Sequence, residues 1–445
     1  MGRGELEQVA ETSQRPPVPP LWTPLGFLLF GLTSLLLALG TVAWWPALLL
    51  TGPLAPPVVA VVHLLTLGFV TSTILGSLYL VSGFAFRARM QEGPADLGAL
   101  VLYAIGTAWV VRGFFAGRPG DSAAGAPFLI LGIGWVAWQS SKALFRSKMP
   151  GATKAPFAMA WVSLAATVAL GVVQATDPSG LRLGGTVVDR VTTHAHVGLA
   201  GWVLVLIMAV GNRLLPMVLP SAMPSGLLAL LPSGLTFSGA ALFGAGRLGG
   251  SQALALAGGL GMVSGVAAFA GTLTWMLRHQ KRPGLAVSRP DPPRFGALSS
   301  VACLLLATGI GVMLALGSSQ PGLVFVYGVL VLLGFFGQLI VAIEQRLVPW
   351  LLWMRAYAAG KHRQVPPVPY RLPWRLLQAL VLGTWAIGPW MLSLATLTGS
   401  LPGIRLAAAG LALSVAGQVM VLVTYGQSAY AVAVSVPISG QGRGT

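Results

Sequence analysis

The chain has 445 residues, of which 55% are hydrophobic and only 8% are charged, and its formal net charge is +17. This composition is too apolar for a soluble protein, whose surface must face water, so it predicts a polytopic membrane protein in a lipid bilayer. A nucleic-acid partner, which so basic a soluble chain would favour, is excluded because the positive charges lie in loops between the apolar segments.

Twelve apolar segments follow one another along the chain, each of roughly 20 residues or more and so long enough to cross a hydrocarbon layer of about 30 Å as a helix. The segments are 21–50, 57–84, 97–115, 127–143, 155–175, 191–219, 225–245, 251–277, 295–316, 322–348, 376–398 and 404–425. The expected fold class is therefore all-α, with about twelve transmembrane helices.

An internal repeat becomes visible when the sequence is displaced by 133 residues, which aligns His63–Phe69, His196–Trp202 and Val329–Phe335. The alignment predicts three four-helix pseudo-repeats. Their expected ranges are 21–150, 154–283 and 287–425, between a tail at 1–20 and a tail at 426–445. The register continues to the expected helix ends at Gly83, Pro216 and Pro349.

The distribution of basic residues predicts the orientation of the chain. If the N-terminus is cytoplasmic, most Lys and Arg residues lie in cytoplasmic loops, for example around Lys142–Lys154 and Arg278–Arg294. Cytoplasmic loops of membrane proteins carry such an excess. We expect a multi-pass protein of the cell inner membrane with both termini in the cytoplasm.

Three histidines lie near the outer ends of predicted helices: His63 in the second segment, and His194 and His196 in the sixth. Residues two apart differ by about 200° around a helix axis, so His194 and His196 should point to nearly opposite sides. Neutral imidazole is a good ligand for haem iron and for copper. The plainer interpretation is that each ring only bonds a backbone carbonyl.

The stretches His63–Phe69, His194–Leu199, Asn212–Met217 and Tyr327–Trp350 resemble the cytochrome c oxidase subunit I-like membrane proteins, relatives of the haem–copper oxidases. The resemblance covers all twelve predicted helices and implies a ring of helices with threefold pseudo-symmetry. It also implies that His63 corresponds to the second-helix histidine that ligates low-spin haem in true oxidases.

The departures from that family are as informative as the matches. True oxidases carry a His-x-His on the tenth helix, where this chain has Tyr327 and Val329, and residues 225–245 lack the histidine pair that would bind the catalytic copper. Acidic residues are nearly absent from the helices, and Glu344 is the main one. A working terminal oxidase or proton pump is therefore not expected, and we interpret Tyr327 as a packing residue.

Two classes of function remain. The first is a redox protein holding b-type haem, with His63 and His196 as axial ligands and His194 as ligand to a second haem or a copper ion. It would transfer electrons to or from a redox partner subunit or cytochrome, or handle a diatomic gas (NO or O2). The alternative is a copper-handling protein or transporter whose pathway is lined by the three histidines. Cys303, the single cysteine, excludes intrachain disulfides and covalent c-type haem attachment, and we interpret it as a packing residue.

Overall fold

The computed structural model describes residues 22–85, 88, 90–177, 179–281, 291–318, 320, 322–359 and 375–434. These residues form helices and connecting turns, and twelve of the helices are long and apolar enough to cross a membrane. The predicted fold class, an all-α polytopic membrane protein, is confirmed.

Nine of the twelve spans are single helices. They are α2 (Trp22–Trp44), α5 (Pro94–Phe115), α6 (Ala126–Arg146), α7 (Gly151–Thr176), α10 (Leu227–Leu248), α11 (Gln252–Arg278), α12 (Pro292–Ala315), α15 (Arg375–Leu397) and α16 (Leu401–Val434). Two short 3₁₀ turns, η1 (Pro46–Leu50) and η3 (Pro119–Gly125), precede the second and fourth spans.

The second, sixth and tenth spans each contain a π-helical segment between two α-helical parts. They are α3 (Pro56–His63), η2 (Leu64–Thr71) and α4 (Ser72–Ala85); α8 (Val187–His196), η4 (Val197–Leu204) and α9 (Val205–Val218); and α13 (Leu323–Val329), η5 (Leu330–Gly337) and α14 (Gln338–Ala359). The π segments begin at Leu64, Val197 and Leu330, so each starts 133 residues after the one before. This is the interval of the sequence repeat.

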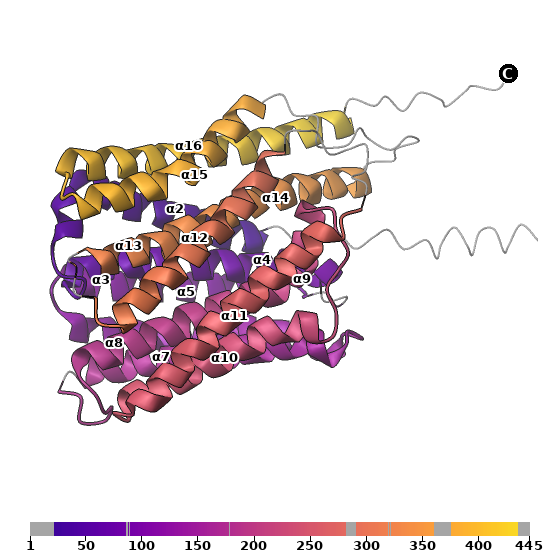
Figure 1. Ribbon diagram of the computed structural model, residues 1–445. Coiled ribbons are helices and arrows are strands. Elements are labelled where there is room, and N and C mark those ends of the chain that lie inside the picture. The colour runs from indigo at the N-terminus through magenta and orange to yellow at the C-terminus, as the bar shows by residue number, and fades with distance from the viewer. Residues whose placement is uncertain are drawn as a thin grey trace, which may run out of the picture.

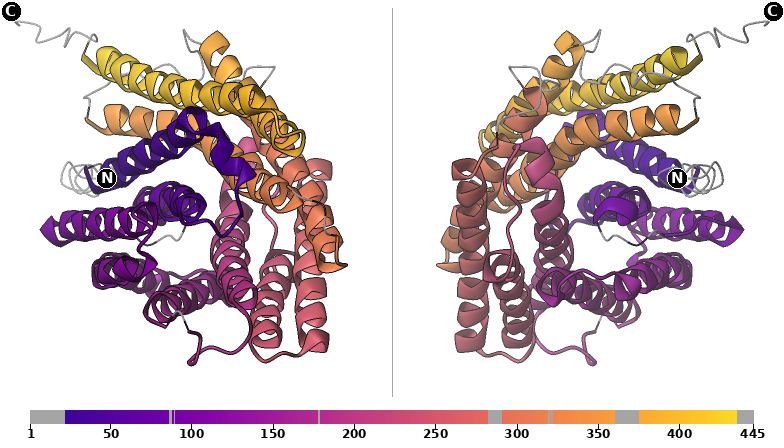
Figure 2. Two further views of the ribbon diagram at one scale, coloured as in Figure 1. Left: turned by 90° about the vertical axis from the view of Figure 1, so that its left-hand side faces the viewer. Right: turned by 90° about the vertical axis from the view of Figure 1, so that its right-hand side faces the viewer.

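These three spans form the centre of the molecule. Their most apolar windows are 61–78% buried, whereas no other span exceeds 50%. They also touch one another, since η2 packs against η5 and α4 packs against α9. In the views along the bundle, the three thirds of the chain occupy three sectors around them (Figure 2).

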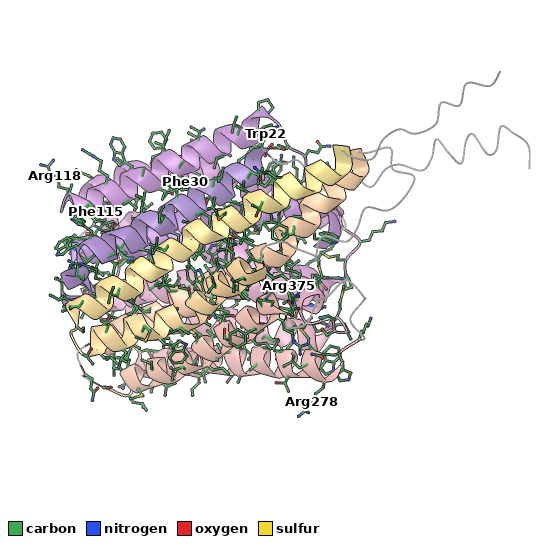
Figure 3. The ribbon with its side chains drawn as sticks, turned by 90° about the horizontal axis from the view of Figure 1, so that it is seen from above. Trp22, Phe30, Phe115, Arg118, Arg278 and Arg375 are labelled. Atoms are coloured by element: carbon green, nitrogen blue, oxygen red, sulfur yellow. The ribbon has the colours of Figure 1, made fainter. Side chains whose placement is uncertain are left out.

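The two ends of the bundle differ in what they hold. Trp22, Arg278 and Arg375 lie together at one end, which we call the terminal face, while Phe115 and Arg118 lie at the opposite end, which we call the distal face (Figure 3). Figure 1 shows α3, α8 and α13 toward the distal face and α9 and α14 toward the terminal face. The N-terminal parts of the three central spans therefore share one depth in the bundle.

Three helices end at residues that differ from the ends of the predicted segments. The first helix ends at Trp44 and gives way to the 3₁₀ turn η1, because Pro46 cannot continue the backbone hydrogen bonds of α2. The tenth span continues through Pro349 to Ala359, since a membrane helix tolerates the one hydrogen bond that proline removes. The last helix extends to Val434 rather than ending at 425, so part of the expected C-terminal tail is helical.

Candidate functional site

Local backbone structure sets the position of each histidine. His63 is the last residue of α3 and directly precedes η2, and His196 is the last residue of α8 and directly precedes η4. The start of α8 is fixed by a capping box: the backbone N–H of Asp189 donates to the hydroxyl oxygen of Thr186, and the backbone N–H of Thr186 donates to the Asp189 carboxylate. A π-helical turn contains an extra residue and is found frequently at functional sites.

His63 and His194 form a pair between α3 and α8. Their ring centroids are 6.4 Å apart and their planes are inclined by 31°. Nδ1 of His63 donates a hydrogen bond to the carbonyl oxygen of Val59 at 2.8 Å, which leaves Nε2 as the nitrogen with a free lone pair. Such a bond on the far side of the ring is how proteins orient histidines that bind metals.

The surroundings of this pair are apolar and tightly packed. The ring of Phe114 stacks on His63 with centroids 5.0 Å apart. Gly171 of α7 lies against His194, because a Cβ at this glycine would be 3.1 Å from Cε1 of the imidazole. Nδ1 of His194 is buried without a hydrogen bond of normal geometry, although the Thr167 backbone lies close enough to polarise it.

His196 lies on the opposite side of the sixth span and meets the tenth. Its Nδ1 donates to the carbonyl oxygen of Thr192 at 2.8 Å, and its Nε2 is 3.4 Å from the hydroxyl oxygen of Tyr327. The two rings are nearly parallel, with centroids 6.2 Å apart, and Phe243 packs on the imidazole with centroids 4.8 Å apart. Because Nδ1 carries the proton bonded to Thr192, the phenol donates and Nε2 accepts.

His194 and His196 point to opposite sides of the helix, as predicted, but the ring beside His63 is not the one that the sequence led us to expect. The structure places His194, not His196, beside His63, and it gives His196 a phenol as its neighbour. Sequence reasoning treated Tyr327 as packing. One feature of the sequence did distinguish Tyr327: it lies at the repeat position equivalent to that of His194.

Positive charge lies one helical turn from the pair toward the distal face. Arg190 precedes His194 by four residues on α8, which places it on the same side of the helix about 6 Å along the axis. The residue is 8% exposed, and its guanidinium packs against Gly180 in the loop before α8. Arg247 is occupied elsewhere, because it forms an ion pair with Asp189.

The donor set near the pair is small. Within the described ranges, no group of three or more His, Cys, Asp or Glu side chains comes together as a metal cluster would require. Cys303 is buried in α12. Of the remaining histidines, His279 is exposed at the end of α11, and His362 lies outside the described residues.

Comparison with known proteins agrees with this architecture. No family model matches the chain, and no curated protein is significantly similar to it. A solved structure that is similar is a heme-copper terminal oxidase, determined by cryo-electron microscopy as a dimer. The two align at 14% identity over 93% of this chain and 82% of the other, with a TM-score of 0.59.

The chain is thus a multi-pass membrane protein with the fold of a heme-copper terminal oxidase. At this level of identity the likeness concerns the fold alone.

Proposed function

We propose that this protein binds one b-type haem between α3 and α8, with His63 and His194 as its two axial ligands. The observation that carries the proposal is the spacing of their rings. Two imidazole nitrogens on one metal ion lie about 4 Å apart, since each bond is about 2 Å, and the ring centroids then lie roughly 6 Å apart. The observed separation of 6.4 Å fits this arrangement.

The number of protein donors favours haem over copper. Haem iron needs only two ligands from the protein, because the porphyrin supplies the other four. The described residues offer two facing imidazoles and no third His, Cys, Asp or Glu beside them. A copper-handling protein or transporter, the alternative, would need His63, His194 and His196 in one site or pathway, whereas His196 faces the other way toward Tyr327.

Arg190 supports the same site. Haem b carries two anionic propionates, and a buried guanidinium one turn from an axial histidine is suited to bind one of them. Arg190 is on the distal side of His194, where it would hold a propionate of the haem.

Ligation by two histidines favours electron transfer over gas binding, because neither axial position is open to a ligand. The proposed role is to pass electrons within the inner membrane to or from a redox partner subunit or cytochrome, as a divergent relative of oxidase subunit I. With cytoplasmic termini, the haem would lie in the outer half of the bilayer. In this proposal His196 is not a haem ligand. Handling of a diatomic gas would require a second haem, held by His196 as its one protein ligand.

The test is the reduced-minus-oxidised absorbance spectrum of the purified protein from a haem-replete host, with a pyridine haemochrome assay for the haem type. We expect a low-spin b-type spectrum that is lost in His63→Ala and in His194→Ala. His196→Ala should keep it. His279→Ala is the matched control, because this ring has the same Nδ1 bond to the carbonyl four residues earlier but is exposed and has no partner histidine.

Two results would overturn the proposal. One is wild-type protein that contains no haem. The other is a spectrum that is lost in His196→Ala and kept in His194→Ala, which would restore the pairing expected from the sequence.

A further inference from the structure

Glu344 is an acidic side chain deep inside the bundle. It lies in α14, where that helix packs against α12 and α16, and it is 5% exposed. The other buried acid within a described span, Asp96, lies in the first turn of its helix. An ionisable group inside a membrane is costly to keep and usually has a function.

Glutamines surround the carboxyl group of Glu344. Nε2 of Gln418 in α16 donates a hydrogen bond to Oε2 of Glu344 at 3.0 Å. Nε2 of Gln345 donates to Oε1 of the same Gln418 at 2.7 Å. Two acceptor atoms in this cluster, Oε1 of Glu344 and Oε1 of Gln345, are buried and have no hydrogen-bond partner.

The comparison with Asp96 shows what a buried carboxylate requires in this protein. Asp96 accepts hydrogen bonds from the Tyr79 hydroxyl at 2.6 Å, the Trp135 indole at 2.8 Å, the Gly93 amide at 2.8 Å and the Gln139 amide at 3.4 Å. Four donors solvate its negative charge in place of water. Glu344 is almost equally buried and has one donor, so its environment suits a neutral carboxylic acid.

Among the residues whose side chains the structure describes, no positive charge forms an ion pair with Glu344. Arg346, two residues later, forms an ion pair with Asp291 at the start of α12, and the second ion pair among the described residues joins Asp189 to Arg247 at the other end of the bundle. The other titratable groups whose side chains are described on α14, α12, α15 and α16 are Arg294, Cys303, Arg375, Arg405 and Tyr425. None of these forms an ion pair with the carboxyl group.

We propose that Glu344, held between α14 and α16 by Gln418, is a proton-binding site of the membrane interior that exchanges its proton with water at the terminal face. The proton binds Oε1, the carboxyl oxygen that accepts no hydrogen bond, and the neutral group then needs no counter-charge. Arg346, two residues after Glu344, forms an ion pair with Asp291 at the start of α12, so Glu344 lies in the part of the tenth span that is directed toward the terminal face. The site is remote from the histidine pair and does not depend on haem.

The test is infrared difference spectroscopy of the whole protein in lipid, in which the C=O stretch of a protonated carboxyl is separate from the bands of carboxylates. We expect this band at neutral pH, moved by exchange into heavy water and by ¹³C-labelling of glutamate. It should disappear in Glu344→Gln, which keeps the shape of the side chain. Asp96→Asn is the matched control and should leave the band unchanged.

A second variant tests the site without removing the acid. Gln418→Leu deletes the hydrogen bond to Oε2, so the band should remain and shift in frequency. The proposal is overturned if the wild-type spectrum lacks the band, or if Glu344→Gln and Gln418→Leu both leave it unaltered. It is also overturned if sodium or potassium chloride replaces the band by carboxylate bands at constant pH, since the ligand would then be a metal cation.

Discussion

The contact between Gly171 and His194 gives a quantitative test of the proposed haem site. In Gly171→Ala, the new Cβ would be 3.1 Å from Cε1 and 3.6 Å from Nδ1 of the imidazole. Carbon atoms in ordinary contact are about 3.5–4.0 Å apart, so the ring or α7 must move by roughly half an ångström. Metal–ligand distances tolerate only about 0.2 Å.

The expected effect on haem binding follows from this displacement. Overpacking by one methyl group in a close-packed interior costs about 1–3 kcal/mol. If the haem-bound protein bears that cost, haem binds roughly 5- to 150-fold more weakly, since about 1.4 kcal/mol corresponds to a tenfold change in the dissociation constant. The same methyl group stabilises the helix by up to about 1 kcal/mol relative to glycine, which offsets part of the overpacking cost in the haem-free protein. Thermal unfolding of the haem-free variant therefore measures how much of that cost remains without haem.

The assay is titration of the haem-free variant with haem, combined with its thermal unfolding in detergent. Gly134→Ala in α6 is the control, because a Cβ there meets no atom within 4 Å and should leave haem affinity unchanged. If Gly171→Ala binds haem as tightly as the wild type, with the same low-spin spectrum, His194 is not a ligand in the position described here.

Three further predictions concern other parts of the chain. Tyr327→Phe removes only the hydroxyl at the second histidine contact, so haem content and spectrum should stay at wild-type values, and a lost or altered spectrum would place a cofactor there. Gly258→Ala puts a Cβ 2.1 Å from the backbone nitrogen of Phe243 and forces α10 and α11 apart. We expect the free energy of unfolding to fall by about 2–3 kcal/mol, which is measured as a lower Tm. The control is Gly259→Ala, whose Cβ meets nothing within 4 Å and should not lower the Tm. Asp96 accepts four hydrogen bonds, and its donors include Tyr79 of α4 and Trp135 of α6. Asp96→Asn should therefore cost about 3 kcal/mol in thermal unfolding, and an unchanged Tm would show that these bonds do not stabilise the packing of α4, α5 and α6.

The helices were predictable because hydropathy alone defines them. An apolar stretch of membrane length must satisfy its own backbone hydrogen bonds, so it becomes a helix whatever surrounds it. The ends were less predictable, as η1 and the continuation through Pro349 illustrate, because they depend on local geometry that composition does not encode. The repeat interval was visible in sequence, but nothing in the sequence showed that each copy contains a π-helical segment.

The sequence could not predict which histidine lies beside His63, for a specific reason. Helical geometry puts His194 and His196 on opposite sides of one helix, but the side that faces His63 depends on whether the central helices follow one another clockwise or anticlockwise. Spacing along the chain is the same for both arrangements. Only the packing in three dimensions decides between them, and it selects His194.

The candidate proton site shows a related limit. Glu344 stood out in the sequence as an acid within an apolar segment. Its partner Gln418 is 74 residues later on another helix, in a stretch with no feature that connects the two. Contacts between helices are set by rotation of each helix about its axis, which a uniformly apolar sequence specifies weakly.

The repeat also explains why this chain has one proposed haem site rather than three. On each central helix, two positions that are two residues apart face the two neighbouring central helices. The threefold arrangement of these helices therefore contains three equivalent pairs of facing positions. Two of the pairs are observed, His63 with His194 and His196 with Tyr327. The repeat register assigns Val329 and Val61 to the third. The first has two imidazoles, the second has one imidazole whose Nε2 accepts from a phenol, and the third has two buried apolar side chains. The two-ligand requirement of low-spin haem is met at the first pair alone. The second pair instead joins the sixth and tenth spans by a hydrogen bond between a phenol and an imidazole.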